Sequence, residues 1–186
     1  MPKDGFFDLA AAPFKFSVLK KPEVWGGFLG SFAIATLIGH FASQKTNRTA
    51  PISLSVFSTI YPLTAFLVGI SEESLFRGYL QSQLCEISNP VTGIILSSLL
   101  FGAAHIGNAK GFSKEARRSY YTFCIPFISV AGGYLGWMSY KNASLQESVA
   151  LHGWYDFTLF ASEAAASQAG MAAISGNKEF SINFSF

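Results

Sequence analysis

The chain has 186 residues, a length that fits one domain. Half of its residues are hydrophobic and only 13% are charged, whereas about a quarter are charged in typical soluble domains. This composition favours a membrane protein. The net charge of +2, without a basic stripe interleaved with aromatic residues, argues against nucleic-acid binding. The cysteines, Cys85 and Cys124, have neither metal-binding spacing nor a disulfide framework, and we interpret them as small buried hydrophobic residues.

The amino-terminal region, residues 1–23, mixes charges and prolines with apolar side chains. We expect it to form an interfacial segment whose apolar residues lie along the bilayer surface, namely Phe6, Phe7, Leu9, Phe14, Phe16 and Leu19. The apolar run Val24–Ser43 then has about the ~20 residues that a transmembrane helix needs, and it predicts a retained first span. A cleaved signal peptide is the alternative. His40, near the end of this span, has no partner at helical spacing and is interpreted as an interfacial residue.

Four further apolar segments follow. The first, Ile52–Ile87, would be about 50 Å long as one helix, longer than the ~30 Å hydrocarbon core, so it must tilt, kink at Pro62 or Gly69, or project from the bilayer. A turn at Asn89–Pro90 comes next. The other predicted segments are a helix over Val91–Ile106, a polar loop over Gly107–Ser119, a helix over Tyr120–Tyr140, and a helix from Leu145 past Phe160.

These segments predict an all-α fold, a polytopic integral membrane helical bundle with about five transmembrane helices. Residues 24–162 would form the membrane core. Residues 163–186 would form a carboxy-terminal tail of weak helix or coil, which ends in a strand-like alternation of phenylalanine or isoleucine with polar residues. Two small-xxx-small spacings, Gly26–Gly30 and Gly132–Gly136, predict close helix packing.

Ionisable residues interrupt the apolar pattern at Ser71–Arg77. Groups such as Glu72 and Glu73 are costly at membrane depth, so they usually face a protein interior and mark a functional site. If the helices on either side of the Ser88–Pro90 turn are antiparallel, Glu72 and His105 both lie about 21–23 Å from that turn. A carboxylate and an imidazole at one depth predict an acid–base pair.

Two further pairs have the four-residue spacing that places side chains on one helix face. Glu73 precedes Arg77, the favourable order for an ion pair, and we expect this pair to support Glu72. His152 precedes Asp156 in the last apolar segment. Glu72, His105 and His152 also fit a zinc site with two histidines and one carboxylate, and the spacing leaves this alternative open. A transporter with a buried proton relay is less attractive, because no inverted repeat is visible.

Three motifs in this order resemble the CAAX protease and bacteriocin-processing family, the Abi-type intramembrane glutamic endopeptidases. They are Glu-Glu-x-x-x-Arg at residues 72–77, Phe-x-x-x-His at residues 101–105, and His-x-x-x-Asp at residues 152–156, where the family has Asn or Asp. The resemblance implies that Glu72 is the general base and that His105 orients the water. It implies that Glu73 and Arg77 support Glu72 or hold the substrate backbone, and that His152 and Asp156 stabilise the oxyanion.

An ionised aspartate would repel an oxyanion, so either burial keeps Asp156 protonated or Asp156 acts by holding His152 in its donor tautomer. Our hypothesis is the second. The predicted protein is a metal-independent intramembrane endopeptidase that needs no cofactor and acts on a membrane-associated, lipid-modified or leader peptide. The alternatives are a zinc-dependent protease using the same cluster and a non-catalytic immunity or binding protein on the same scaffold. We expect a multi-pass protein of a bacterial plasma (inner) membrane whose partners are its peptide substrate and the lipid bilayer.

Overall fold

The computed structural model describes residues 2–43 and 61–175. Three short elements come first: α1 (Phe6–Ala11), a 3-10 turn (Ala12–Phe14) and α2 (Phe16–Leu19). The long helix α3 (Pro22–Ser43) follows. Its bounds match the predicted first span closely. His40 lies in its last turn, and the predicted start of the second segment at Ile52 lies outside the described residues.

The second predicted segment is helical up to Ile87 but not regular. A 3-10 turn (Tyr61–Leu63) leads into α4 (Thr64–Glu73), a π-helical segment (Ser74–Gln81) and α5 (Ser82–Ile87). The chain then reverses at Asn89, whose side chain accepts a hydrogen bond from the Thr92 amide at 3.0 Å and so caps α6. The turn predicted at Asn89–Pro90 is therefore confirmed.

The second half of the described chain contains three long helices. α6 (Pro90–Ala104) continues as a 3-10 segment (His105–Ala109). α7 (Lys114–Ser119) runs through a π-helical segment (Tyr120–Cys124) into α8 (Ile125–Asn142), and α9 spans Gln146–Ser175. The loop predicted over Gly107–Ser119 is therefore wrong in its second half. Ser113 caps α7 by accepting a hydrogen bond from the Ala116 amide at 3.2 Å, and the helix begins there.

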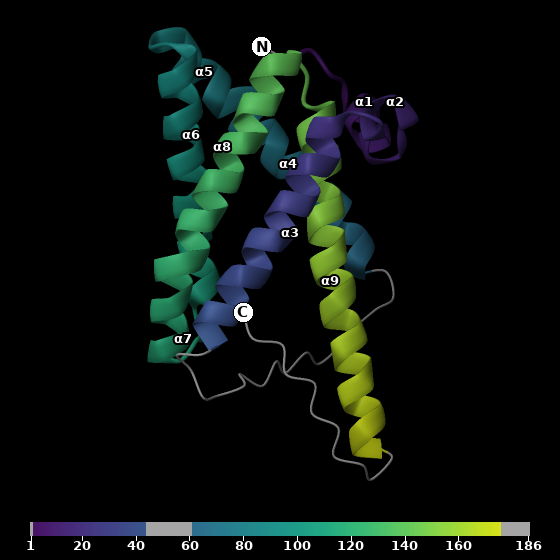
Figure 1. Ribbon diagram of the computed structural model, residues 1–186. Coiled ribbons are helices and arrows are strands. Elements are labelled where there is room, and N and C mark those ends of the chain that lie inside the picture. Colours follow the sequence, from purple (N-terminus) through teal and green to yellow (C-terminus); the bar gives the residue numbers. More distant parts are fainter. Residues whose placement is uncertain (1, 44–60, 176–186) are drawn as a thin grey trace.

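The helices pack as two neighbouring pairs with α3 crossing beside them. α6 lies against α8, and α4 lies against α9 (Figure 1). One core cluster joins α2, α3, α8 and α9 through Val18, Val24, Leu135, Met138, Ala150 and Leu151. A second cluster joins α1, α4 and α9 through Leu9, Ile70, Leu145 and Val149. The described part of the chain is thus an all-helical bundle.

Helix length and hydropathy identify the segments that suit a bilayer. Within residues 2–43 and 61–175, Pro90–Ala109 is long and apolar enough to cross a membrane, with a mean hydropathy of 1.5, and Pro22–Ile38 is a shorter apolar helix. The total of five spans stays a prediction.

The amino-terminal segment differs in part from the interfacial prediction. Its phenylalanines point outward, since Phe7 and Phe16 are 85% and 79% exposed, but Leu9 is only 4% exposed. Leu9 is buried because α1 packs on α4 and α9.

The close packing predicted at the two glycine spacings is found at one of them and not at the other. An added Cβ at Gly132 would meet Phe101 and Arg77, whereas Gly26 and Gly30 face open space and Gly27 makes the close contact instead.

Candidate active site

Glu72 and His105 face each other across the bundle. Glu72 lies at the end of α4, and His105 follows the last residue of α6. The Glu72 Oε2 and His105 Nε2 atoms are 3.9 Å apart. The two side chains thus lie at the same depth of the bundle, as helix length predicts.

The protonation pattern of His105 follows from its second nitrogen. Its Nδ1 lies 2.8 Å from the Phe101 carbonyl oxygen, which only accepts hydrogen bonds, so Nδ1 carries the proton. In the neutral ring Nε2 is then an acceptor that points at Glu72. Two acceptors, the Glu72 carboxylate and the His105 Nε2, thus face the same small space.

His152, on α9, lies between three carboxylates. Its Nδ1 is 2.9 Å from Glu73 Oε1, while its Nε2 is 3.4 Å from Asp156 Oδ2 and 3.8 Å from Glu72 Oε2. Because a carboxylate can only accept, Nδ1 donates to Glu73. The residue that orients the His152 ring through Nδ1 is therefore Glu73, a partner that the sequence did not predict. Asp156 instead lies at the opposite nitrogen.

Glu73 and Arg77 form a buried ion pair deeper in the bundle than Glu72 and His105. Their side chains are 0% exposed, and Arg77 donates to Glu73 Oε1 over 3.0 Å. The same guanidinium donates to the Gly132 carbonyl oxygen at 3.1 Å and lies over the Phe101 ring at 4.1 Å. A desolvated arginine is tolerated here because a carboxylate, a carbonyl and an aromatic face surround it.

Backbone geometry brings these groups together. The π-helical segment begins directly after Glu73, and π-helical turns often occur at functional sites. Gly132 has no side chain, so α8 approaches closely enough for its carbonyl to reach Arg77. Sequence reasoning named Gly132 only as a packing residue. It gave no role to the Phe101 carbonyl, although Phe101 opens the second motif.

All six predicted site residues converge, and they form two layers. Glu72, His105 and Asp156 are partly accessible, with side chains 29%, 20% and 17% exposed, whereas Glu73 and Arg77 are fully buried and His152 connects the layers. Glu72 Oε2 is itself buried and has no hydrogen-bond donor in the described part of the chain. A reacting molecule could therefore reach Glu72 and His105 but not the pair below.

Across residues 2–43 and 61–175, no group of three or more His, Cys, Asp or Glu side chains has the geometry to hold a metal ion. The Nε2 atoms of His105 and His152 lie 3.9 Å and 3.8 Å from the same Glu72 oxygen, Oε2. These distances are longer than a direct hydrogen bond.

A family model described as type II CAAX prenyl endopeptidase Rce1-like matches residues 55–158, more than half of the chain. The chain belongs to this family. The resemblance drawn from the three motifs is thereby confirmed, and the match covers all six predicted site residues. The Rce1-like endopeptidases are membrane-embedded peptidases, so the chain has the scaffold of a membrane protease. No curated protein and no solved structure matched the chain.

Proposed function

We propose that this chain hydrolyses peptide bonds in or beside the bilayer by metal-independent glutamic chemistry, with Glu72 as the general base. The observation that carries the proposal is the pair of acceptors 3.9 Å apart, Glu72 Oε2 and His105 Nε2, at the accessible side of the cluster. A water that donates one hydrogen to each would keep a lone pair free for attack. Glu72 Oε2 forms no hydrogen bond with a described residue, so its lone pairs remain available to the water.

The proposed reaction follows from these positions. The water oxygen attacks the scissile carbonyl carbon as its proton moves to Glu72, and the carbonyl becomes an oxyanion. His152 Nε2–H donates to that oxyanion, which requires both ring nitrogens to be protonated because Nδ1 already donates to Glu73. The tetrahedral intermediate then expels the amine, which takes the proton from Glu72. Water is consumed and two new chain ends form.

Glu73, Arg77 and Asp156 act through His152. Glu73 and Arg77 are too deeply buried to touch a substrate, so we assign them as positioning residues for His152. Asp156 lies 3.4 Å from His152 Nε2 and compensates the charge of the doubly protonated ring. The proposed substrate is a peptide segment in the membrane, either lipid-modified or a leader peptide.

The test compares membrane proteomes of cells carrying the wild type, Glu72→Gln or Glu86→Gln. Glu86 is an exposed glutamate on α5 and serves as the matched control. We expect Glu72→Gln to slow cleavage at least ~100-fold, the effect of losing a general base, so that an uncleaved precursor accumulates. Peptide termini that are identical in all three strains would refute the peptidase assignment.

The zinc alternative is separated by a second measurement on the purified protein. We expect cleavage of the accumulated precursor to continue in the presence of a chelator, with no stoichiometric zinc retained. Loss of activity with chelator and recovery with zinc would favour a zinc protease that uses the same residues.

A further inference from the structure

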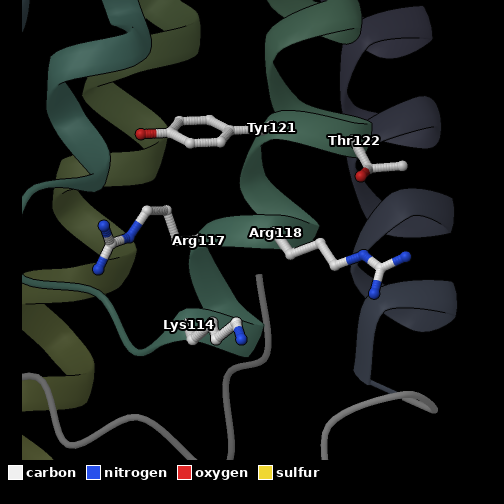
Figure 2. Close-up of a pocket in the computed structure, with 5 residues that line it drawn as sticks. All are labelled: Lys114, Arg117, Arg118, Tyr121 and Thr122. Atoms are coloured by element: carbon white, nitrogen blue, oxygen red, sulfur yellow. The ribbon is translucent and has the colours of Figure 1, made fainter.

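Helix α7, which Ser113 caps, has a cationic face. It follows the membrane-length segment Pro90–Ala109 along the chain. Lys114, Arg117 and Arg118 line an open groove of about 570 Å³ together with Tyr121 and Thr122 (Figure 2). These residues are spaced i, i+3, i+4, i+7 and i+8, which is one face of a helix. No acidic side chain of the described residues forms an ion pair with any of the three cations.

A second, apolar groove continues from the first. Its volume is about 260 Å³, and Thr122 lines both grooves. The apolar groove lies between α3 and α8, and its other lining residues are Ile34, Ile38, Phe123, Pro126, Phe127 and Val130. Figure 2 shows Arg118 and Thr122 pointing to the side where α3 passes. The two grooves thus form one path from charged to apolar.

The dimensions of this path match a lipid leaflet. Pro90–Ala109 is the membrane-length helix, so the cations of α7 come directly after its end, at headgroup depth. From Arg118 to Val130 the helix rises about 18 Å, close to the ~15 Å of half a hydrocarbon core.

The path also faces away from the proposed catalytic cluster. Gly132 contacts Arg77 and Phe101, whereas Val130, two residues earlier, points to nearly the opposite side of α8 at 100° per residue. Val130 is 69% exposed and Ile34 is 45% exposed. An occupant would therefore come from the surrounding bilayer and not from the peptide site.

We propose that the grooves along α7 and α8 bind one anionic phospholipid, with its phosphate on Lys114 and Arg118 and an acyl chain between α3 and α8. Arg117 is not part of this site, because its side chain points away from Arg118 (Figure 2) and donates to the Phe112 carbonyl oxygen at 3.3 Å. An arginine donates a pair of hydrogen bonds to phosphate oxygens, and the two positive charges of Lys114 and Arg118 favour a lipid with a net negative charge over a zwitterionic one. The apolar half distinguishes a lipid from a free phosphate, because a free anion would leave that groove uncovered.

The test is native mass spectrometry of the full-length protein released from detergent. We measure retention of phosphatidylglycerol against phosphatidylcholine with the same acyl chains. The wild type should retain one phosphatidylglycerol preferentially. Lys114→Gln/Arg118→Gln should bind it roughly 30-fold more weakly, since each cation near an anionic lipid contributes about 1 kcal/mol, a factor of about five. The control Lys3→Gln/Lys20→Gln removes two exposed charges elsewhere and should bind normally.

The apolar half is tested by Val130→Asn, with Val91→Asn as a control of nearly equal exposure on α6, 67% against 69%. We expect Val130→Asn alone to weaken retention. Equal binding of the two lipids, an unchanged preference in Lys114→Gln/Arg118→Gln, or equal loss in both valine variants would overturn the proposal. Displacement of the lipid by millimolar inorganic phosphate would also overturn it, because the site would then be one for free phosphate. None of these readouts depends on peptidase activity.

Discussion

Two neighbouring glutamates have opposite surroundings in this protein. Glu73 is fully buried and accepts from both Arg77 and His152, whereas Glu72 is 29% exposed and its buried oxygen has no donor among the described residues. Adjacent helix positions point about 100° apart, so a single step along the chain moves a carboxylate from the interior to the accessible layer. The same chemical group can therefore serve structure at one position and reaction at the next.

This contrast predicts different effects on stability. Glu73→Gln leaves the buried Arg77 without its counter-charge, and breaking such a pair costs about 3–5 kcal/mol. Glu72→Gln removes a carboxylate that forms no direct hydrogen bond, so its free energy of unfolding should change by less than about 1 kcal/mol. Thermal unfolding in detergent, followed by circular dichroism, measures both variants. Equal destabilisation would show that Glu72 is also a structural residue.

Sequence spacing predicted some contacts among the six candidate residues and not others. It predicted the Glu73–Arg77 pair because those residues are four apart on one helix. It placed Glu72 opposite His105 because a short turn joins their helices. The Glu73–His152 hydrogen bond joins residues 79 positions apart on separate elements, and neither helical period nor a connecting turn fixes such a contact. The partner that orients His152 was therefore missed.

At the level of elements, the close approach of α8 depends on one face of that helix. Gly132 and Gly136 face the chain segment that carries Arg77 and Gln81, and the backbones approach closely because neither glycine has a side chain. The carbonyls of the same two glycines accept from Arg77 at 3.1 Å and from Gln81 at 2.9 Å. The small-xxx-small spacing thus lets backbone oxygens satisfy buried polar side chains as well as bringing helices together.

Gly132→Ala should therefore disturb both packing and the site. An added Cβ would lie 2.9 Å from the Phe101 ring and 3.0 Å from Arg77 Nη2, so we expect a loss of about 1–3 kcal/mol from overpacking. Gly133→Ala is the matched control, because its Cβ would meet only Ser98, with the nearest atom at 3.4 Å. Unfolding midpoints of the two variants, measured in the same detergent, give the comparison. A larger loss in the Gly133 variant would contradict this account of the interface.

Periodicity located the long helices well and the connections less well. α3 and α6 begin and end within two residues of their predicted limits because their apolar runs have clear boundaries. The polar stretch before Tyr120 was predicted as a loop, since its charges break the apolar pattern. Ser113 nevertheless caps a helix there, and the charged residues then occupy an exposed helix face. Polarity marks the end of an apolar segment, but not the end of a helix.

In the molecule as a whole, the amino-terminal segment connects to the helix that carries His152. Asp4 accepts from the Leu145 amide at 2.8 Å, from Gln146 Nε2 at 2.9 Å and from Ser144 Oγ at 3.1 Å. Further along, Trp154 donates to the Pro13 carbonyl oxygen at 2.8 Å. The first amide groups of a helix lack partners within it, so a carboxylate placed there satisfies donors and complements the helix dipole. The start of α9 is thus held by residues from the other end of the chain.

Asp4→Ala should loosen α9 at its first turns. Because hydrogen bonds to a charged group contribute about 1.5–3 kcal/mol, the variant should lose stability of that order. Amide exchange should accelerate from Gln146 towards His152, and cleavage should slow as the ring loses its fixed position. The control is Asp8→Ala, which removes an exposed carboxylate paired with Lys15 and should cost less than about 1 kcal/mol. If amide exchange in α9 responds equally to both variants, Asp4 does not hold the helix, and the position of His152 depends on the packing of α9 against α4 alone.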